Sequence, residues 1–237
     1  MTIDLGESEN GEESPQRELE APDDVDALYF ARGDDVAELF SNRPNFTGDV
    51  LRRADGNLIA LVQHPCAMEH STGSRLLVCQ VKPVDRKLRW SGGDYKRMPL
   101  PELFRGENHA VEFDLLDLVD RAEITQLERV AILSQIGVNL LVQRWVHHNS
   151  RVVIWTKTID AQTSGPAEET DIRADMVDEL LQNGWQVDAA KAAANDWLDV
   201  QPGGKGTHRR RQMLIDPQKR AAIRKEARQF SRNAPPE

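Results

Sequence analysis

The most chemically versatile stretch of the sequence is the run His64-Pro65-Cys66-Ala67-Met68-Glu69-His70. A thiolate, two imidazoles and a carboxylate fall within seven residues, and zinc or copper uses such ligands. His64, Cys66 and His70 are therefore candidate metal ligands, with zinc as the implied cofactor. Structural zinc sites usually draw on two separated ligand pairs, so the stretch also fits a strand end and turn with a buried cysteine and no cofactor. A reactive thiol is a third interpretation, and it would need a base within hydrogen-bond reach.

The second candidate site is a run of cations near the C-terminus. On a helix that starts at Pro217, residues 220, 224 and 228 recur at every fourth position and form one cationic stripe. Such a stripe suits phosphate contacts that do not depend on base sequence, which makes the segment a candidate nucleic-acid interface. A solvated charged helix, or one folded against the acidic N-terminal segment, explains the same pattern. The candidate contact residues are Arg209, Arg210, Arg211, Lys219, Arg220, Arg224, Lys225 and Arg228.

The tryptophans divide into two groups by their surroundings in the sequence. Four lie within apolar patterns and are predicted to belong to the core: Trp145, Trp155, Trp185 and Trp197. Trp90 lies beside Arg89, close to Tyr95 and several cations, in a stretch of glycines that is predicted to be a loop or an irregular edge. That cluster is a candidate for an exposed contact site.

Charge is distributed unevenly along the chain, which has 237 residues and a net charge of -9. Residues 1–40 hold 13 Asp and Glu against two Arg, while residues 205–232 hold ten Lys and Arg against one Asp and one Glu. The two ends therefore attract each other or attract different partners.

Composition also bounds the cellular setting. No stretch approaches the roughly 20 apolar residues that cross a bilayer, and the first ten residues lack the basic-then-apolar order of a signal peptide. The sequence therefore predicts a cytoplasmic protein without membrane contact. Cys66 and Cys79 are its two cysteines, and we expect both to be reduced thiols.

Apolar spacing predicts a mixture of strands and helices. Strands are expected at residues 47–51, 58–63, 75–81, 109–118 and 151–159. The pair Asp55-Gly56 between two apolar runs is a strong hairpin signal. Thr125-Gln126-Leu127-Glu128 is typical of a capping box and opens a predicted long helix that ends near His148. That helix is the expected partner of the sheet.

The remaining segments complete a predicted division of the chain. Residues 161–170 are expected to form a linker, and Asn183-Gly184 marks the turn of a helical hairpin. Asp216-Pro217 is expected to start the last helix. The predicted units are an acidic disordered head at 1–26, an α+β core at 27–160, the helical hairpin at 161–204 and a basic helical tail at 205–237.

The strand order from Gly48-Asp49-Val50 to Arg75-Leu76-Leu77-Val78 resembles the start of an SH3-like small barrel, and in outline it is similar to toxins of the PemK/MazF type. The resemblance implies a small β-barrel and a toxin-like endoribonuclease of a toxin–antitoxin or phage-defence system. Such an enzyme would need an arginine paired with a hydroxyl or an acid near Arg52, Arg53 and Ser71-Thr72. Where those toxins carry an Arg-Pro pair, this chain has Asp55-Gly56-Asn57.

The predicted fold class is thus α+β, with a small SH3-like β-barrel or a curled antiparallel sheet packed on a long helix and a C-terminal helical extension. A second resemblance, carried by Cys66 after an apolar strand and a later helix with Arg129 and Arg144, is to uncharacterised bacterial and phage proteins. The leading hypothesis is a non-enzymatic adaptor of phage or mobile-element origin that contacts a protein partner through its core and nucleic acid or an acidic surface through its tail. The alternatives are the endoribonuclease and a small metal-binding module.

Overall fold

The computed structural model describes residues 18–40, 42–70, 74–85, 88–90, 95–200 and 209–235. The strands of this part are β1 (Tyr29–Arg32), β2 (Asp49–Arg52), β3 (Leu58–Leu61), β4 (Arg75–Pro83), β5 (Arg97–Phe104), β6 (Glu107–Asp120) and β7 (Glu128–Leu133). The helices are the 3-10 turn η1 (Asp26–Leu28), α1 (Asp34–Leu39), α2 (Pro65–His70), α3 (Arg121–Ile124), α4 (Gln135–Ser150), α5 (Thr156–Gln182), α6 (Val187–Asp199), α7 (Arg210–Met213) and α8 (Pro217–Asn233).

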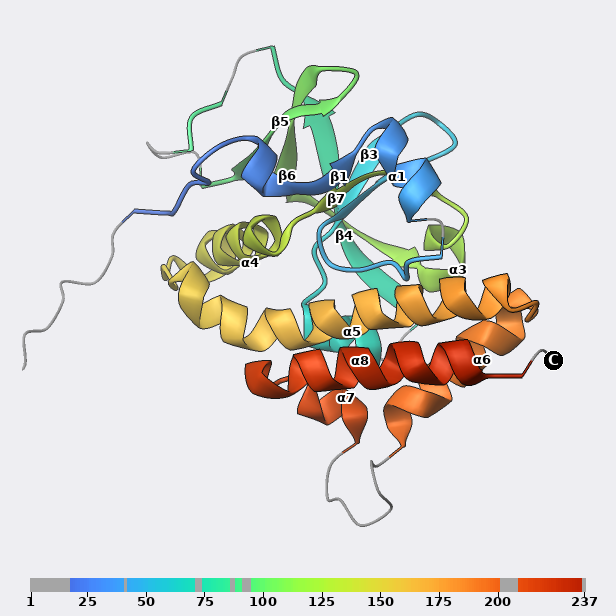
Figure 1. The fold of residues 1–237 in the computed structure, drawn as a ribbon. Coiled ribbons are helices and arrows are strands. Elements are labelled where there is room, and N and C mark those ends of the chain that lie inside the picture. Colours follow the sequence, from blue (N-terminus) through green and yellow to red (C-terminus); the bar gives the residue numbers. More distant parts are fainter. Residues whose placement is uncertain are drawn as a thin grey trace, which may run out of the picture.

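The described strands form a single antiparallel sheet in the order β1-β7-β2-β3-β4-β6-β5. The sheet curls until its two end strands meet, because Tyr29 Oη in β1 donates to the Pro101 carbonyl in β5 at 2.9 Å. Arg32 and Glu102 reinforce this contact at 3.6 Å. The result is a nearly closed barrel with helices below it (Figure 1). The predicted α+β class, with a curled antiparallel sheet packed on a helix, is confirmed.

Helix α4 closes the main hydrophobic core against the barrel strands. Ser134 caps the helix, since its Oγ accepts the N–H of Gly137 at 3.1 Å. Gly137 packs so tightly that a Cβ there would lie 2.4 Å from the Leu28 carbonyl oxygen. The cap and the glycine together fix where the helix leaves the sheet.

The predicted long helix from Thr125 is wrong in its first third. Residues 128–133 form β7, which lies between β1 and β2 in the sheet, and the helix starts only after Ser134. The run from Val130 to Leu133 is buried throughout. A short, fully buried strand cannot be distinguished from a buried helix by periodicity alone. Here the segment forms a strand because β1 and β2 offer it hydrogen-bonding partners on both sides.

The predicted strand at 151–159 and the predicted linker at 161–170 are also wrong. Arg151 adopts a left-handed conformation (φ 61°) that ends α4, and α5 begins at Thr156 and continues without a break to Gln182. Helix α5 therefore contains Ser164-Gly165-Pro166, which the sequence indicates as a linker. Gly165 is needed there because a Cβ would lie 3.3 Å from the Ile215 backbone.

Pro166 leaves a detectable mark inside α5. A proline has no N–H, so the carbonyl of Gln162, four residues earlier, has no helical donor. The Cys66 thiol lies 3.8 Å from that oxygen and donates to it from α2. The proline thus creates an acceptor that ties α2 to α5.

The described part of the N-terminal segment is held against α4 and α5. The Glu20 carboxylate accepts hydrogen bonds from the Thr156 N–H and hydroxyl and from the side chain of Gln143, at 2.6 to 2.8 Å. Glu20 therefore supplies the cap that α5 lacks in its own sequence. The sequence predicts disorder as far as residue 26; residues 1–17 of that head lie outside the described residues.

Several turns and helix starts match the sequence prediction. The hairpin between β2 and β3 is confirmed, with Gly56 at φ 86°. The turn at Asn183-Gly184 and the last helix after Asp216 are also confirmed, and Asp216 accepts the N–H of Gln218 at 3.0 Å. Tyr29 and Phe30 lie in β1, and Gly33 precedes α1.

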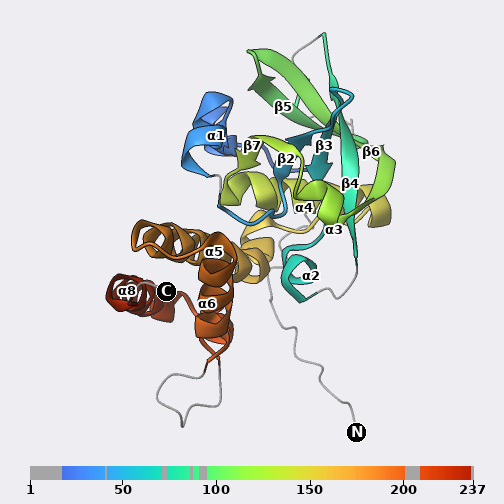
Figure 2. The same ribbon diagram turned by 90° about the vertical axis from the view of Figure 1, so that its right-hand side faces the viewer.

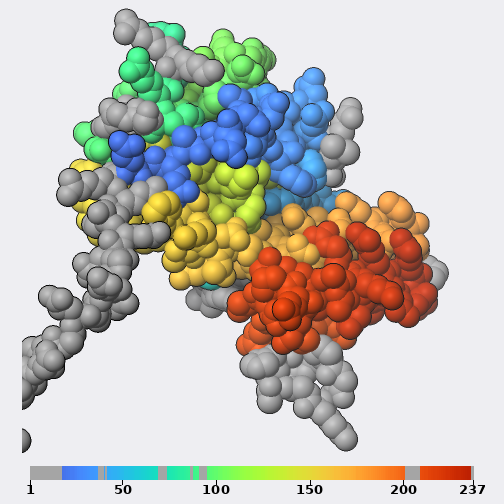
Figure 3. All heavy atoms as spheres, turned by 60° about the vertical axis from the view of Figure 1, so that its left-hand side comes forward, coloured from blue at the N-terminus to red at the C-terminus, as the bar shows by residue number. Residues whose placement is uncertain are grey.

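Helices α5 to α8 form a second unit with its own apolar core (Figure 2). Ile223 and Ala227 of α8 are buried against residues of α5 and α6. Figure 3 shows α8, in red, packed along the orange helices as one lobe. The basic tail is thus part of a folded unit. None of the helices in the described ranges has both the length and the apolar composition required to cross a membrane.

Replacement of Ile223 tests whether α8 belongs to this core. Because the side chain is 2 % exposed, Ile223→Asp would bury an unpaired charge, and we expect a loss of at least about 3 kcal/mol in the free energy of unfolding. Lys225→Ala on the exposed face of the same helix should change it by about 0.5 kcal/mol or less. Urea unfolding measures both. Equal stabilities would contradict the packing of α8.

Candidate ligand-binding cleft

A cleft of about 580 Å³ opens between the barrel and the helical unit. Its volume falls within the usual range for small-ligand sites. Five cationic side chains line it, and Glu128 is the one carboxylate among its lining residues. The cations are Arg43, Arg121, Arg129, Arg173 and Lys191.

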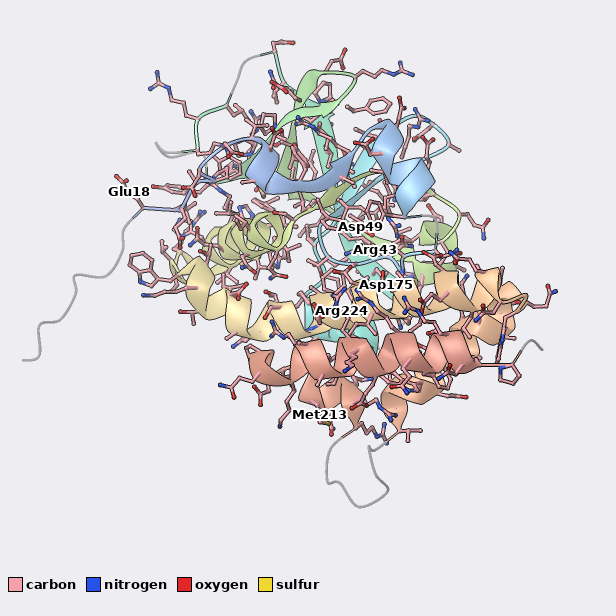
Figure 4. All side chains as sticks on the ribbon, in the orientation of Figure 1. Glu18, Arg43, Asp49, Asp175, Met213 and Arg224 are labelled. Atoms are coloured by element: carbon pink, nitrogen blue, oxygen red, sulfur yellow. The ribbon has the colours of Figure 1, made fainter. Side chains whose placement is uncertain are left out.

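The upper wall of the cleft is built on the buried carboxylate of Asp49, at the start of β2. This side chain is fully buried, and it bonds Arg43 Nη1 at 3.0 Å and lies 3.0 Å from Arg129 Nε. It also accepts the N–H of Phe46 at 2.9 Å. Figure 4 shows Arg43 and Asp49 together just above α5. One carboxylate therefore orients two arginines and the loop before β2.

Arg129, which projects from β7, holds the rest of that loop. Its two terminal nitrogens donate to the carbonyls of Phe40 and Arg43 and to Asn45 Oδ1, at 2.7 to 2.9 Å. Arg43 in turn reaches Asp171 on α5 at 3.3 Å. Burial raises the pKa of Asp171, and the neighbouring Arg43 opposes that rise. These contacts join the barrel to the helical unit across the back of the cleft.

The cleft offers hydrogen-bond donors far more than acceptors. The amide oxygens of Asn45 and Asn195 accept from Arg129 and Arg173, so their N–H groups are what these residues can offer a ligand. Arg121 donates to the Met68 carbonyl at 3.2 Å. Within the described ranges, neither Arg121 nor the exposed Lys191 forms an ion pair with a carboxylate. Such a surface is suited to an anion.

His64 and Cys66, two of the three predicted metal ligands, are not among the residues that line the cleft. The Cys66 N–H donates to His64 Nδ1 at 3.3 Å, and burial lowers the pKa of His64. The side chain of His70 lies outside the described residues. Among the residues with a described position, no three His, Cys, Asp or Glu side chains are grouped to hold a metal ion. A zinc site at His64, Cys66 and His70 stays a prediction.

The expectation of a buried cysteine at position 66 is wrong. Cys66 is exposed on α2, and Cys79 in β4 is the buried cysteine. The chain turns into a short helix at Pro65 rather than into a tight turn, which carries the thiol outward.

The cations of the tail are largely engaged within the helical unit. Arg224 contacts Glu168 at 2.7 Å and Asp175 at 3.4 Å on α5, a contact visible in Figure 4. Arg211 pairs with the buried Glu169. The remaining contacts are Arg209 with Asp199, Arg210 with Glu226, Lys219 with Asp216, and Arg220 with Ser164 and the Leu214 carbonyl.

Within the described residues, the tail therefore pairs mainly with carboxylates of α5 and α6, and these ion pairs bear on whether its cations are available to a ligand. Lys225 and Arg228 have no carboxylate within ion-pair distance in the described structure. Exposed pairs of this kind contribute about 0 to 1 kcal/mol each, so they stabilise the tail weakly, but a phosphate would have to compete with each of them. That the tail binds nucleic acid stays a prediction.

Two tryptophans lie in surroundings that differ from the sequence prediction. Trp90 is half-buried under the Arg144 guanidinium, which lies 4.8 Å from the ring centroid and donates to the Trp90 carbonyl at 2.7 Å. Its indole therefore packs against α4. Trp155, predicted to be core, is 41 % exposed because it precedes α5 and does not lie in a strand.

The arginines proposed for a ribonuclease are both ion-paired. Arg52 pairs with Glu128, and Arg53 contacts Asp117 at 2.8 Å and Glu123 at 3.9 Å. Ser71-Thr72 lies outside the described residues. The endoribonuclease hypothesis therefore stays a prediction that rests on the sequence resemblance.

Nothing in the sequence marks the lining residues of the cleft as a group. Arg43, Arg121 and Lys191 are isolated cations in three distant segments, and none belongs to a motif. The available signal is Asp49 at the head of an apolar strand, because a carboxylate in a buried run requires a cationic or hydrogen-bonding partner. That signal predicts a buried ion pair but not a cleft.

Fold and site together define a nearly closed β-barrel with a helical lobe and a cationic cleft between them. Comparisons with protein-family models, curated proteins and solved structures find no match to this chain. The site is therefore interpreted from its own geometry.

The central carboxylate can be tested by an isosteric change. Asp49→Asn would leave the buried Arg129 without its counter-charge and Arg43 with its contact to Asp171 alone, and we expect a loss of about 3–5 kcal/mol in the free energy of unfolding. Asp117→Asn, which breaks the more exposed pair with Arg53, should cost about 1 kcal/mol or less. Chemical denaturation of the two variants provides the comparison. A small effect at Asp49 would refute its role as the hub.

Thiol labelling tests the placement of the two cysteines. Burial raises the pKa of Cys79 to about 12, so near neutral pH its reactive thiolate is scarce as well as shielded. We expect iodoacetamide to add one group to the native protein, at Cys66, and two groups in denaturant. Mass spectrometry of the intact chain counts the adducts. Two adducts on the native protein would contradict the burial of Cys79.

Proposed function

We propose that this protein is a non-enzymatic binding protein whose ligand is an anion held in the cationic cleft. The observation that carries the proposal is the lining itself, with five cations and one carboxylate in a chain whose net charge is -9. A cleft lined mainly by one sign of charge concentrates the field and raises the local concentration of ligands of opposite charge.

Prior organisation of the donors supports binding. Asp49 and Asp171 hold Arg43, while Asp49 and three loop acceptors hold Arg129, so both side chains lose little freedom when a ligand binds. Arg121 and Lys191 then supply charge that no carboxylate of the described chain neutralises. The cleft also joins the two units, which makes the bound state sensitive to both.

The broader hypotheses keep their places as proposals. An adaptor role with a protein partner, a phage or mobile-element origin and a cytoplasmic location rest on the sequence. Nucleic-acid binding by the tail is less favoured than anion binding by the cleft, because six of its eight candidate cations have partners within the chain.

Calorimetric titration with two probes, tripolyphosphate and a short oligo-glutamate, tests the proposal. We expect at least one probe to bind, and Arg121→Gln and Lys191→Gln each to weaken it about tenfold, which corresponds to about 1.4 kcal/mol. Lys82→Gln, an exposed cation on β4, and Lys225→Gln in the tail are matched controls that should leave the affinity unchanged.

Two results would contradict the proposal. Neither probe binding would show that the cleft is not an anion site. Binding that is lost in Lys225→Gln but retained in Arg121→Gln would place the site on the tail.

A further inference from the structure

We propose that the anion is a nucleoside phosphate, bound with its phosphate on the Arg121 and Lys191 side of the cleft and its base against Phe40. This inference rests on the proposed function and adds the class of ligand. Three observations support it: an aromatic wall, a set of amides, and acidic surroundings that disfavour a long polyanion.

The aromatic wall consists of Phe40 at the end of α1, with Phe30 of β1 behind it. Phe40 lines the cleft and is half-buried, and its ring centroid lies 5.0 Å from that of Phe30 at an angle of 52°. The carbonyl of Phe40 accepts from Arg129, which fixes this residue beside the cations. A π-face next to guanidinium groups is how proteins hold a base and its phosphate together.

Amide groups stand beside this wall. Asn42 and Asn45 both line the cleft. Asn42 donates to Asp178 at 2.8 Å, and Asn45 Oδ1 is taken by Arg129. Each amide keeps donor and acceptor capacity beyond that one bond, which can pair with the edge of a base. Pro44 and Leu127 complete an apolar surface of the kind that a base needs on desolvation.

Charges around the cleft favour a small ligand over a polymer. Asp34 and Asp35 start α1, and Asp175 and Asp178 lie on α5. A nucleic-acid strand or an acidic peptide that continued along α1 or α5 would bring further negative charge towards these carboxylates, and like charges repel. A single nucleotide fits a cleft of about 580 Å³ and does not have to extend along α1 or α5.

The test compares the binding of a nucleotide to the wild-type protein with the binding of its nucleoside part and of its phosphate part. Calorimetry or thermal shift is run with the common nucleoside monophosphates and triphosphates, the corresponding nucleosides, and inorganic phosphate and tripolyphosphate. We expect at least one nucleotide to bind about tenfold or more tightly than both its nucleoside and the matching inorganic anion. The comparison requires no variant, so a folding defect cannot obscure it.

Variants then show which residues bind the phosphate and which bind the base. Arg121→Gln should weaken nucleotide and inorganic anion alike, about tenfold. Phe40→Leu should weaken the nucleotide about tenfold and leave tripolyphosphate unchanged, and Phe40→Tyr should retain nucleotide affinity because it keeps the ring. Unchanged binding of tripolyphosphate to Phe40→Leu also shows that the variant is folded.

The outcomes separate this inference from the proposed function. Inorganic anions that bind as tightly as every nucleotide would overturn the nucleotide assignment and leave the anion site standing. Tighter binding of an oligonucleotide or of oligo-glutamate, retained in Phe40→Leu, would replace the nucleotide by that polymer. Absence of binding by nucleotides, inorganic anions and oligo-glutamate alike would overturn both proposals.

Discussion

The structure depends on one buried carboxylate, that of Asp49. It is removed from water at the base of the barrel, and the arginines that neutralise it come from the loop before β2 and from β7. Taking a carboxylate and a guanidinium out of water costs several kcal/mol for each ion, and the arrangement is tolerable only because nearly every remaining hydrogen-bonding position is used. The same requirement that makes the ion pairs expensive makes their geometry specific, and that geometry forms the wall of the cleft.

Electrostatic complementarity within the chain takes a different form in the helical unit. The cations of α7 and α8 meet carboxylates of α5 and α6, such as Glu168 and Asp199, in partly exposed pairs. These pairs add little stability individually, and the apolar side chains beneath them do most of the packing. Charge therefore sets the register of α8 on α5, while burial of Ile223 and its neighbours sets the strength of the contact.

The sequence predicts the features that local chemistry decides. Asp55-Gly56 between two apolar runs specifies the hairpin, and Asp216-Pro217 specifies the start of α8, because each depends on a few adjacent residues. It fails where distant partners decide. Glu128–Leu133 fits a helix or a strand until β1 and β2 provide hydrogen-bonding partners. Pro166 indicates a linker until Ile215, in the turn before α8, packs against Gly165.

The cleft cannot be predicted from local sequence patterns, because distant segments build it. Its walls come from the loop at Arg43, from Arg121 and Arg129 around α3 and β7, and from Lys191 on α6. The charge asymmetry of the chain predicts that the basic tail attracts acidic groups, but a net charge does not say which groups these are. Within the described residues, carboxylates of α5 and α6 pair with the cations of the tail.

Helix α5 has a further consequence, since it is about 40 Å long at 1.5 Å per residue. Ile159 near its start belongs to the barrel core, while Ile172 and Leu180 belong to the core of the helical lobe. The helix runs from one core to the other without a break. We therefore expect the barrel and the helical lobe to unfold as one cooperative unit. A substitution that destabilises one end of α5 should then lower the stability of the other core as well.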